Sequence, residues 1–127
     1  MVKSEYKSTG KRDLEERTLK FANDIVGFVE RLPRTIPNNE LVKQLVRSAG
    51  SIGANYIEAN EALGKKDFLL RLRICRKEAK ESVYWLKLIR VKTDIIVEQR
   101  DTLLQEATEL TKIFGAIVTK LQPPENV

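Results

Sequence analysis

Apolar side chains recur in four stretches of the chain at alternating spacings of four and three residues, with polar side chains between them. The first stretch repeats as Leu14, Thr18, Phe21, Ile25, Phe28 and Leu32. This spacing puts the repeated positions on one side of an α-helix and is typical of the packed side in a left-handed bundle. The pattern predicts a helix over residues 13–32, which ends because the residue before Pro33 disfavours the α-helical conformation.

The other three stretches have the same repeat. The second, over residues 39–63, runs through Leu41, Leu45, Ser48, Ile52, Asn55, Ala59 and Ala62. The third, over residues 67–92, runs through Phe68, Leu72, Cys75, Ala79, Ser82, Leu86 and Ile89. The fourth, over residues 98–121, runs through Leu103, Ala107, Leu110, Phe114, Ile117 and Leu121. Four amphipathic helices with short links predict an all-α fold, an up-down-up-down antiparallel four-helix bundle.

Local signals suggest where the helices and the domain begin and end. One asparagine of the Asn38-Asn39 pair is expected to cap the second helix, Gly64 to end it and Asp67 to cap the third. We expect residues 13–127 to form a single bundle domain. Residues 1–12 are basic and have little to bury, so they are predicted to be a mobile arm.

The short link between the second and third helices predicts an antiparallel hairpin in which facing residue numbers sum to about 130. Ser48 should then face Ser82, and Asn55 should face Cys75. Gly50 and Gly53 lie within the second helix, where each glycine costs about 1 kcal/mol relative to alanine. We therefore expect a neighbouring helix to approach closely along this small-residue stretch.

Polar side chains of the second helix lie beside the third. They are Arg47, Ser51, Asn55 and Glu58. We interpret them as a hydrogen-bond and ion-pair network that fixes the register of the hairpin, with Arg47 facing Glu81. The alternative is a polar pocket between the two helices.

Composition excludes several kinds of function. A chain with 42% hydrophobic and 32% charged residues is an ordinary folded protein, and no apolar run or leader suggests a membrane or secretion, so a cytoplasmic location is expected. The chain has no histidine and one cysteine, which removes the commonest general base and the usual zinc ligands. We predict no cofactor, no metal and no enzymatic activity, and we interpret Glu58 with Glu61, and Glu78 with Glu81, as solvated carboxylates.

Positive charge is concentrated in the third helix. Residues 66–92 contain nine basic and three acidic residues, a net charge of +6, whereas the whole chain carries +5. Five of the basic residues fall within an arc of about 100°, with a sixth just beyond: Arg73, Arg76, Lys77, Lys80, Lys87 and Arg90. Such a stripe favours sequence-independent binding of RNA or DNA. The alternative is a solvated face with local ion pairs such as Lys77 to Glu81, and neither an RNA-binding signature nor an aromatic stacking platform is recognised beside it.

The opposite flank of the third helix mixes acidic and large apolar side chains outside the core repeat. Its members are Ile74, Glu78, Glu81 and Trp85. A second apolar stripe on a bundle helix predicts a subunit interface, with Trp85 as its anchor. The alternative is that Trp85 is buried within its own bundle.

Two motifs, one on each helix of the central hairpin, are those of a known family. They include Arg47-Ser48-Ala49, Ser51-Ile52-Gly53-Ala54-Asn55-Tyr56, Lys77-Glu78-Ala79 and Tyr84-Trp85-Leu86. In these motifs the chain resembles the four helix bundle protein family, also called the ribosomal RNA intervening-sequence or S23-type ribosomal-protein-like family. The resemblance implies a bundle that assembles into a homopentameric ring, and it brings no catalytic residues. A related fold occurs in accessory proteins of diversity-generating retroelements, which are similar pentamers thought to bind nucleic acid.

These observations together favour a non-enzymatic homo-oligomer, a pentamer if the resemblance holds, that binds RNA or DNA through the basic stripe. The alternative is a protein–protein scaffold without nucleic-acid binding. Salt dependence separates the two, because phosphate binding weakens steeply as salt rises.

Overall fold

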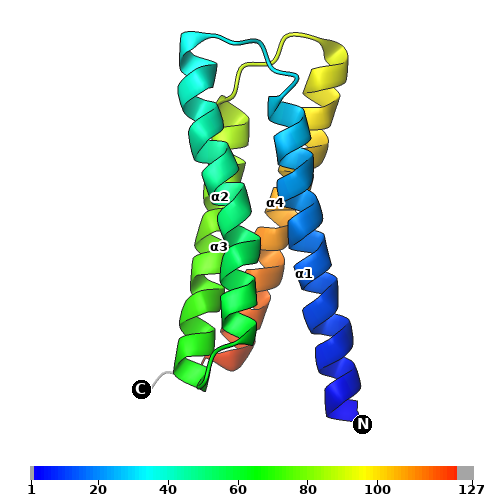
Figure 1. Ribbon diagram of the computed structural model, residues 1–127, viewed down its shortest axis with the longest axis vertical. Coiled ribbons are helices and arrows are strands. Elements are labelled where there is room, and N and C mark those ends of the chain that lie inside the picture. The colour runs from blue at the N-terminus through cyan, green and yellow to red at the C-terminus, as the bar shows by residue number, and fades with distance from the viewer. Residues whose placement is uncertain (1, 123–127) are drawn as a thin grey trace.

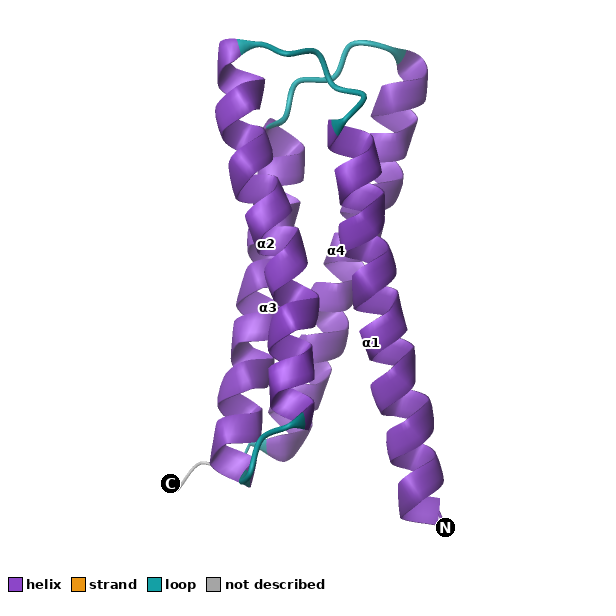
Figure 2. Ribbon diagram, in the orientation of Figure 1, coloured by secondary structure: helices purple, strands orange, loops and turns teal. Residues whose placement is uncertain are grey.

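The computed structural model describes the backbone of residues 2–122 and the side chains of residues 13–122. Four α-helices make up this part of the chain: α1 (Val2–Val29), α2 (Ile36–Asn60), α3 (Lys65–Leu88) and α4 (Asp94–Leu121). They run alternately up and down, and each packs against its neighbours in chain order while α4 packs against α1 (Figures 1 and 2). The predicted four-helix bundle is confirmed.

Helix α1 begins earlier than the apolar pattern predicts. Residues 2–12 continue the helix, and its first turns diverge from the other three helices at the N-terminal end (Figure 1). The side chains of the predicted basic arm lie outside the described residues, and its mobility stays a prediction. From residue 13 onward, α1 packs against α2 and α4 as the repeat requires.

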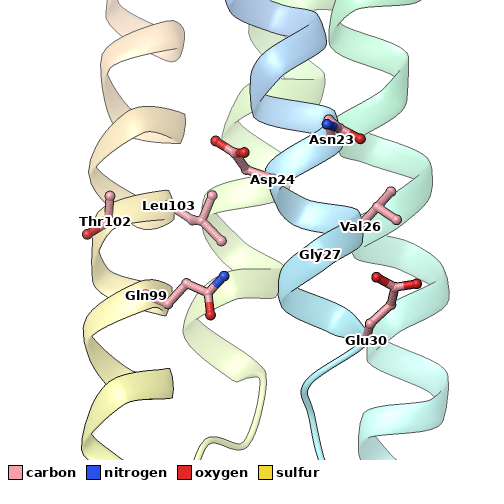
Figure 3. Close-up of a pocket in the computed structure, with 8 residues that line it drawn as sticks. All are labelled: Asn23, Asp24, Val26, Gly27, Glu30, Gln99, Thr102 and Leu103. Carbon is pink, nitrogen blue, oxygen red and sulfur yellow. The ribbon is translucent and has the colours of Figure 1, made fainter.

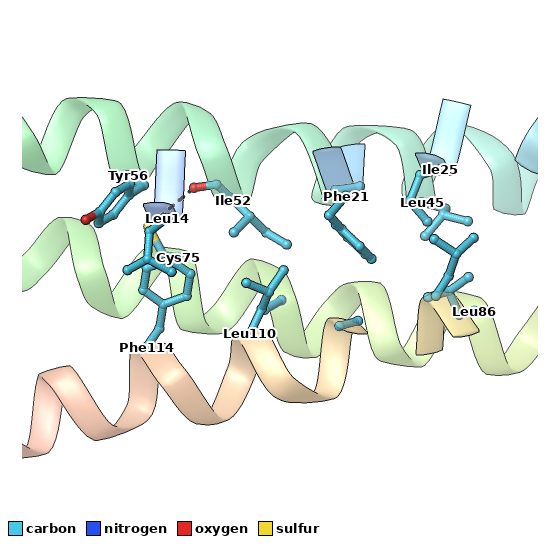
Figure 4. Packing of buried hydrophobic residues seen from close by; sticks show 14 of the residues in the cluster. Leu14, Phe21, Ile25, Leu45, Ile52, Tyr56, Cys75, Leu86, Leu110 and Phe114 are labelled. Atoms are coloured by element: carbon cyan, nitrogen blue, oxygen red, sulfur yellow. Dashed lines mark hydrogen bonds between the residues drawn. The ribbon is translucent and has the colours of Figure 1, made fainter. Parts of the chain in front are cut away.

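The core follows the predicted repeat closely. All six repeat positions of the first stretch are at most 9% exposed. Large side chains from every helix are completely enclosed, among them Phe21, Ile25, Leu45, Leu72, Leu86, Leu110 and Phe114 (Figure 4). Each such side chain contributes roughly 1.5–3 kcal/mol by leaving water, so this apolar seam is the main source of stability.

Every helix boundary except the end of α4 differs from the prediction, the start of α1 by eleven residues and the others by two to four. Thr35, and not an asparagine, caps α2, because its hydroxyl accepts a hydrogen bond from the Asn38 backbone N–H at 3.2 Å. Gly64 caps the start of α3 in an extended conformation with φ −146°, instead of ending α2. Thr93 caps α4. The expected caps were wrong because several residues able to cap lie close together in these links, and the path of the chain selects among them.

Asn38 has a role that its sequence neighbourhood does not suggest. Its side chain is 1% exposed and bonds to both the α1–α2 and the α3–α4 loops, which lie at the same end of the bundle (Figure 1). Its Nδ2 donates to the carbonyls of Pro33 at 3.3 Å and Arg90 at 3.1 Å, and its Oδ1 accepts from the Arg90 backbone N–H at 3.0 Å. One side chain thus joins two loops that are distant in sequence.

Only one of the two glycines in α2 marks a close approach. A Cβ at Gly53 would lie 3.0 Å from Oγ1 of Thr18, whereas a Cβ at Gly50 would meet nothing within 4 Å. At Gly53 the helix that approaches is therefore α1, while α2 also packs closely against α3, as the hairpin pattern suggested. Thr18 is 1% exposed and its hydroxyl donates to the Leu14 carbonyl at 2.7 Å. This hydrogen bond holds Oγ1, the atom nearest to Gly53, in place.

Candidate nucleic-acid interface

The register of the α2–α3 hairpin orients the outer face of α3. Ser48 and Ser82 lie opposite each other with their hydroxyl oxygens 2.9 Å apart, both fully buried. This confirms the predicted pairing of residues whose numbers sum to 130. Nearby, the Cys75 thiol donates to the Ile52 carbonyl at 3.4 Å, so small polar groups hold the two helices in one alignment.

Two of the four predicted network residues reach across to α3. The Arg47 guanidinium bonds to Glu78 at 3.4 Å and to Glu81 at 3.2 Å. Asn55 accepts a hydrogen bond from Arg71 at 3.1 Å, one turn away from the expected Cys75. For the other two predicted members, Ser51 and Glu58, no side-chain bond to α3 occurs among the described residues.

Arg47 has a consequence for the charge of α3. Glu78 and Glu81 are the acidic residues of this helix beyond its first turn, and both face Arg47 on α2. Glu81 therefore pairs with Arg47 instead of the Lys77 partner considered in the alternative. The acidic groups of α3 are compensated on its α2 side, which leaves the cations on the outer side without acidic partners.

We call the predicted cationic set the basic face: Arg73, Arg76, Lys77, Lys80, Lys87 and Arg90. All six side chains are exposed, and within residues 13–122 none of them makes an ion pair or side-chain hydrogen bond. Elsewhere in the bundle Arg17, Lys20 and Arg100 are engaged by carboxylates, whereas the exposed Arg34, Lys92 and Lys120 make no ion pair among the described residues. The basic face therefore combines exposure with uncompensated charge.

The basic face extends beyond α3. The Arg76 Nε lies 3.6 Å from the position that a Cβ would take at Gly115, so this side chain crosses onto α4. In the antiparallel register set by that contact, Lys112 of α4 falls beside Lys80, and its side chain is exposed. Sequence reasoning missed Lys112 because it considered one helix at a time.

An aromatic side chain also lies on the basic face. Tyr84 is 57% exposed and stands one helical turn from Lys80 on one side and Lys87 on the other. Its ring packs edge-to-face with Trp85, with centroids 5.0 Å apart and an interplanar angle of 73°. One exposed aromatic ring therefore lies among the cations, where the sequence pattern showed no stacking platform. Position 84 lies within the arc of about 100° that contains five of the cations, but only the structure shows that its ring is exposed.

Most of the predicted subunit-interface residues are buried or paired with other side chains of the same chain. Glu78 is 6% exposed and paired with Arg47. Ile74 and Trp85 are half-buried, and Trp85 packs against the core cluster. The Trp85 indole Nε1 is buried and has no hydrogen-bond partner in the described part of the chain. That these residues form an interface stays a prediction.

A shallow depression of about 510 Å³ lies between α1 and α4 (Figure 3). Its lining is Asn23, Asp24, Val26, Gly27, Glu30, Gln99, Thr102 and Leu103. Asp24 is bonded to Lys20 at 2.6 Å and Gln99 to Arg31 at 3.0 Å. Within the described residues, no group of three or more potential metal ligands occurs. The four described helices also include none with the length and hydropathy of a membrane span.

The family model of the 23S rRNA-intervening sequence protein matches residues 11–116. The chain belongs to this family. A protein of unknown function from the S23 ribosomal protein family of Bacteroides thetaiotaomicron VPI-5482 has a similar solved structure, with 32% sequence identity and a TM-score of 0.72. That match covers 86% of this chain and 97% of the other. No curated protein gives a significant match. Membership in the intervening-sequence family confirms the resemblance drawn from the hairpin motifs.

Proposed function

We propose that this protein is a non-enzymatic homo-oligomer that binds RNA or DNA through the basic face. One observation carries the proposal: five exposed cations share one side of α3, with Arg90 just beyond its end, while Glu78 and Glu81 are engaged by Arg47. Uncompensated cations attract phosphate and release its counterions on binding. The chain has no histidine, and the Glu78–Glu81 pair forms ion pairs with Arg47, which supports a binding role over a catalytic one.

The dimensions of the basic face suit a nucleic-acid backbone. Arg73 and Lys87 are fourteen residues apart on one helix, a distance of about 21 Å at about 1.5 Å per residue. Phosphates along one strand of a duplex recur at about 3.4 Å, so about six nucleotides fit this length. Because all the contacts are to phosphate, the affinity should be independent of sequence and should fall steeply with salt.

Self-association is the second part of the proposal. Four apolar side chains are exposed along the outer edge where α1 meets α2: Leu19, Val26, Val46 and Ile57, which are 37–68% exposed. In the antiparallel register set by Gly53 beside Thr18, Val26 is level with Val46, whereas Leu19 and Ile57 are offset by more than one helical turn. Exposed apolar side chains gathered along one edge commonly mark a protein contact. The number of five copies rests on the family resemblance, and a ring would repeat the basic face and add avidity.

The test is a titration of fluorescent duplex and single-stranded RNA and DNA at low and physiological salt. The test variant replaces the central cations with glutamine: Arg73, Arg76, Lys77 and Lys80. We expect the slope of log affinity against log salt to fall by about 3–4 on duplex, because each phosphate contact contributes about 0.9. Light scattering should give an unchanged mass.

A matched control removes the same number of charges from elsewhere in the bundle, again as glutamine: Lys20, Arg31, Lys43 and Lys120. This variant should retain most of the affinity, because only the cations on the basic face contact phosphate. Equal losses in both variants would show that net charge alone drives binding and would refute the assignment of the basic face.

The second candidate is a protein–protein scaffold that does not bind nucleic acid, and the exposed apolar edge between α1 and α2 favours it. Binding of no nucleic acid at low salt would reject the first proposal and leave this one. In either case, a lone cysteine that is buried and unpaired fits a reducing cytoplasm.

A further inference from the structure

Tyr84 is the one large aromatic side chain of α3 that is mainly exposed, and it stands among cations. Its neighbours one turn away are Lys80 and Lys87, both exposed, and Lys77 lies two turns away on the same side. Its hydroxyl makes no hydrogen bond to any described residue. A ring that is 57% exposed on a charged surface is not explained by packing of the monomer.

The geometry of the ring leaves a face open. Tyr84 and Trp85 meet at 73° with centroids 5.0 Å apart, so the edge of one ring points at the face of the other. In either arrangement at least one face of Tyr84 is free of Trp85. Trp85 itself packs against the core cluster, so the contact between the two rings joins Tyr84 to a side chain that is held in place.

We propose that Tyr84 stacks on an unpaired base while Lys80 and Lys87 bind the phosphates on either side, so that the basic face takes single-stranded nucleic acid. This inference rests on the function proposed above and specifies its ligand. Aromatic side chains stack on any base because every base has a π-face. Stacking on Tyr84 therefore adds affinity without sequence preference. The phosphate contacts made by the lysines are likewise independent of sequence.

A duplex would gain nothing from Tyr84. Its bases are paired and stacked on one another, and at an intact duplex the ring would meet only backbone and groove edges. Tyr84 should therefore raise the affinity for single strands alone. A protein partner could also use an exposed tyrosine, and the experiment below separates that possibility.

The experiment uses the full chain and three short oligonucleotides of about eight nucleotides, a length close to that of the basic face. One is single-stranded, one is the corresponding duplex, and one is a single strand of the same length with abasic sites in place of its bases. Tyr84→Ala removes the ring, and Tyr84→Phe keeps it and is the matched control. RNA and DNA versions of each ligand are titrated at low salt.

We expect Tyr84→Ala to weaken single-strand binding by about 5- to 150-fold, the range that follows from the loss of one stacked base. Tyr84→Phe should bind like the original protein. On the duplex and on the abasic strand, Tyr84→Ala should change affinity by less than about twofold. Trp85, the single tryptophan of the chain, gives a second readout, because single-strand binding should change its fluorescence in the original protein and in Tyr84→Phe.

Each contrary result has its own meaning. If the original protein binds none of the ligands, the proposed function and this inference both fall. If it binds all three and Tyr84→Ala has the same small effect on each, the basic face stands and stacking is refuted. A changed mass of Tyr84→Ala in light scattering would make Tyr84 a subunit contact and also overturn the inference.

Discussion

Replacing Asn38 with alanine should destabilise the end of the bundle where the α1–α2 and α3–α4 loops lie. The buried side chain makes three hydrogen bonds, two as donor to the carbonyls of Pro33 and Arg90 and one as acceptor from the Arg90 backbone N–H. Alanine fills none of these roles. The Arg90 N–H loses its partner, and the two carbonyls must find water in a space that a methyl group only partly fills.

The expected cost follows from counting these bonds. A typical intramolecular hydrogen bond contributes about 1 kcal/mol net, and a buried group left without a partner costs about 1–3 kcal/mol. The 3.3 Å bond to Pro33 is long, and water can reach part of the vacated space. We therefore expect Asn38→Ala to lower the free energy of unfolding by about 2–3 kcal/mol, a large share of the 5–15 kcal/mol of an ordinary domain.

Urea denaturation followed by circular dichroism measures this loss. With a slope of roughly 1–3 kcal/mol per molar urea, the midpoint should fall by about 0.7–3 M. Protein concentration must be held constant, because self-association would itself add stability. The control is Asn39→Ala, a change at an exposed neighbour, which should cost no more than about 0.5 kcal/mol. A loss below that value for Asn38→Ala, or equal losses for both, would refute the reasoning.

Three further outcomes are expected. In thermal melts Gly50→Ala should stabilise the protein by up to about 1 kcal/mol, because alanine favours the helix. Gly53→Ala should lose that gain or reverse it, because its Cβ would lie 3.0 Å from the Thr18 side-chain oxygen on α1. Equal gains in stability from the two variants would contradict this contact. Burial raises the pKa of the Cys75 thiol to about 12 from 9.0, so a thiol reagent at pH 8 should label only unfolded chains. The unfolded thiol ionises first as pH rises, so this group should reduce stability between about pH 9 and pH 12, a loss that Cys75→Ala should remove. Arg17→Met should lower the free energy of unfolding by about 1 kcal/mol, and by less at high salt, because it removes a bidentate ion pair to Glu106 at 2.7 and 2.8 Å. A loss of stability that salt does not reduce would show that packing, not charge, is responsible.

Much of the basic face could be predicted from sequence, because five of its six cations belong to α3, where helical geometry alone places them on one side. Arg90 follows the end of α3 and an extended Ile89, so helical geometry does not place its side chain. The surroundings of the basic face could not be predicted. Lys112 joins it from α4, and Arg47 removes the acidic partners from α2. Whether a cation has a carboxylate beside it depends on the neighbouring helix, and periodicity within one helix carries no information about that.

The sequence by itself determined the bundle and its core, because a repeat of four and three residues leaves an apolar side that a helix can only bury against other helices. It also determined the hairpin register at Ser48 and Ser82, since a short link gives two antiparallel helices little freedom to slide. The tertiary structure alone decided that Gly53 admits α1, that Asn38 joins two loops, and that Tyr84 is exposed beside lysines. Each of these depends on atoms contributed by segments distant in sequence, and their distances are set only when all four helices pack together.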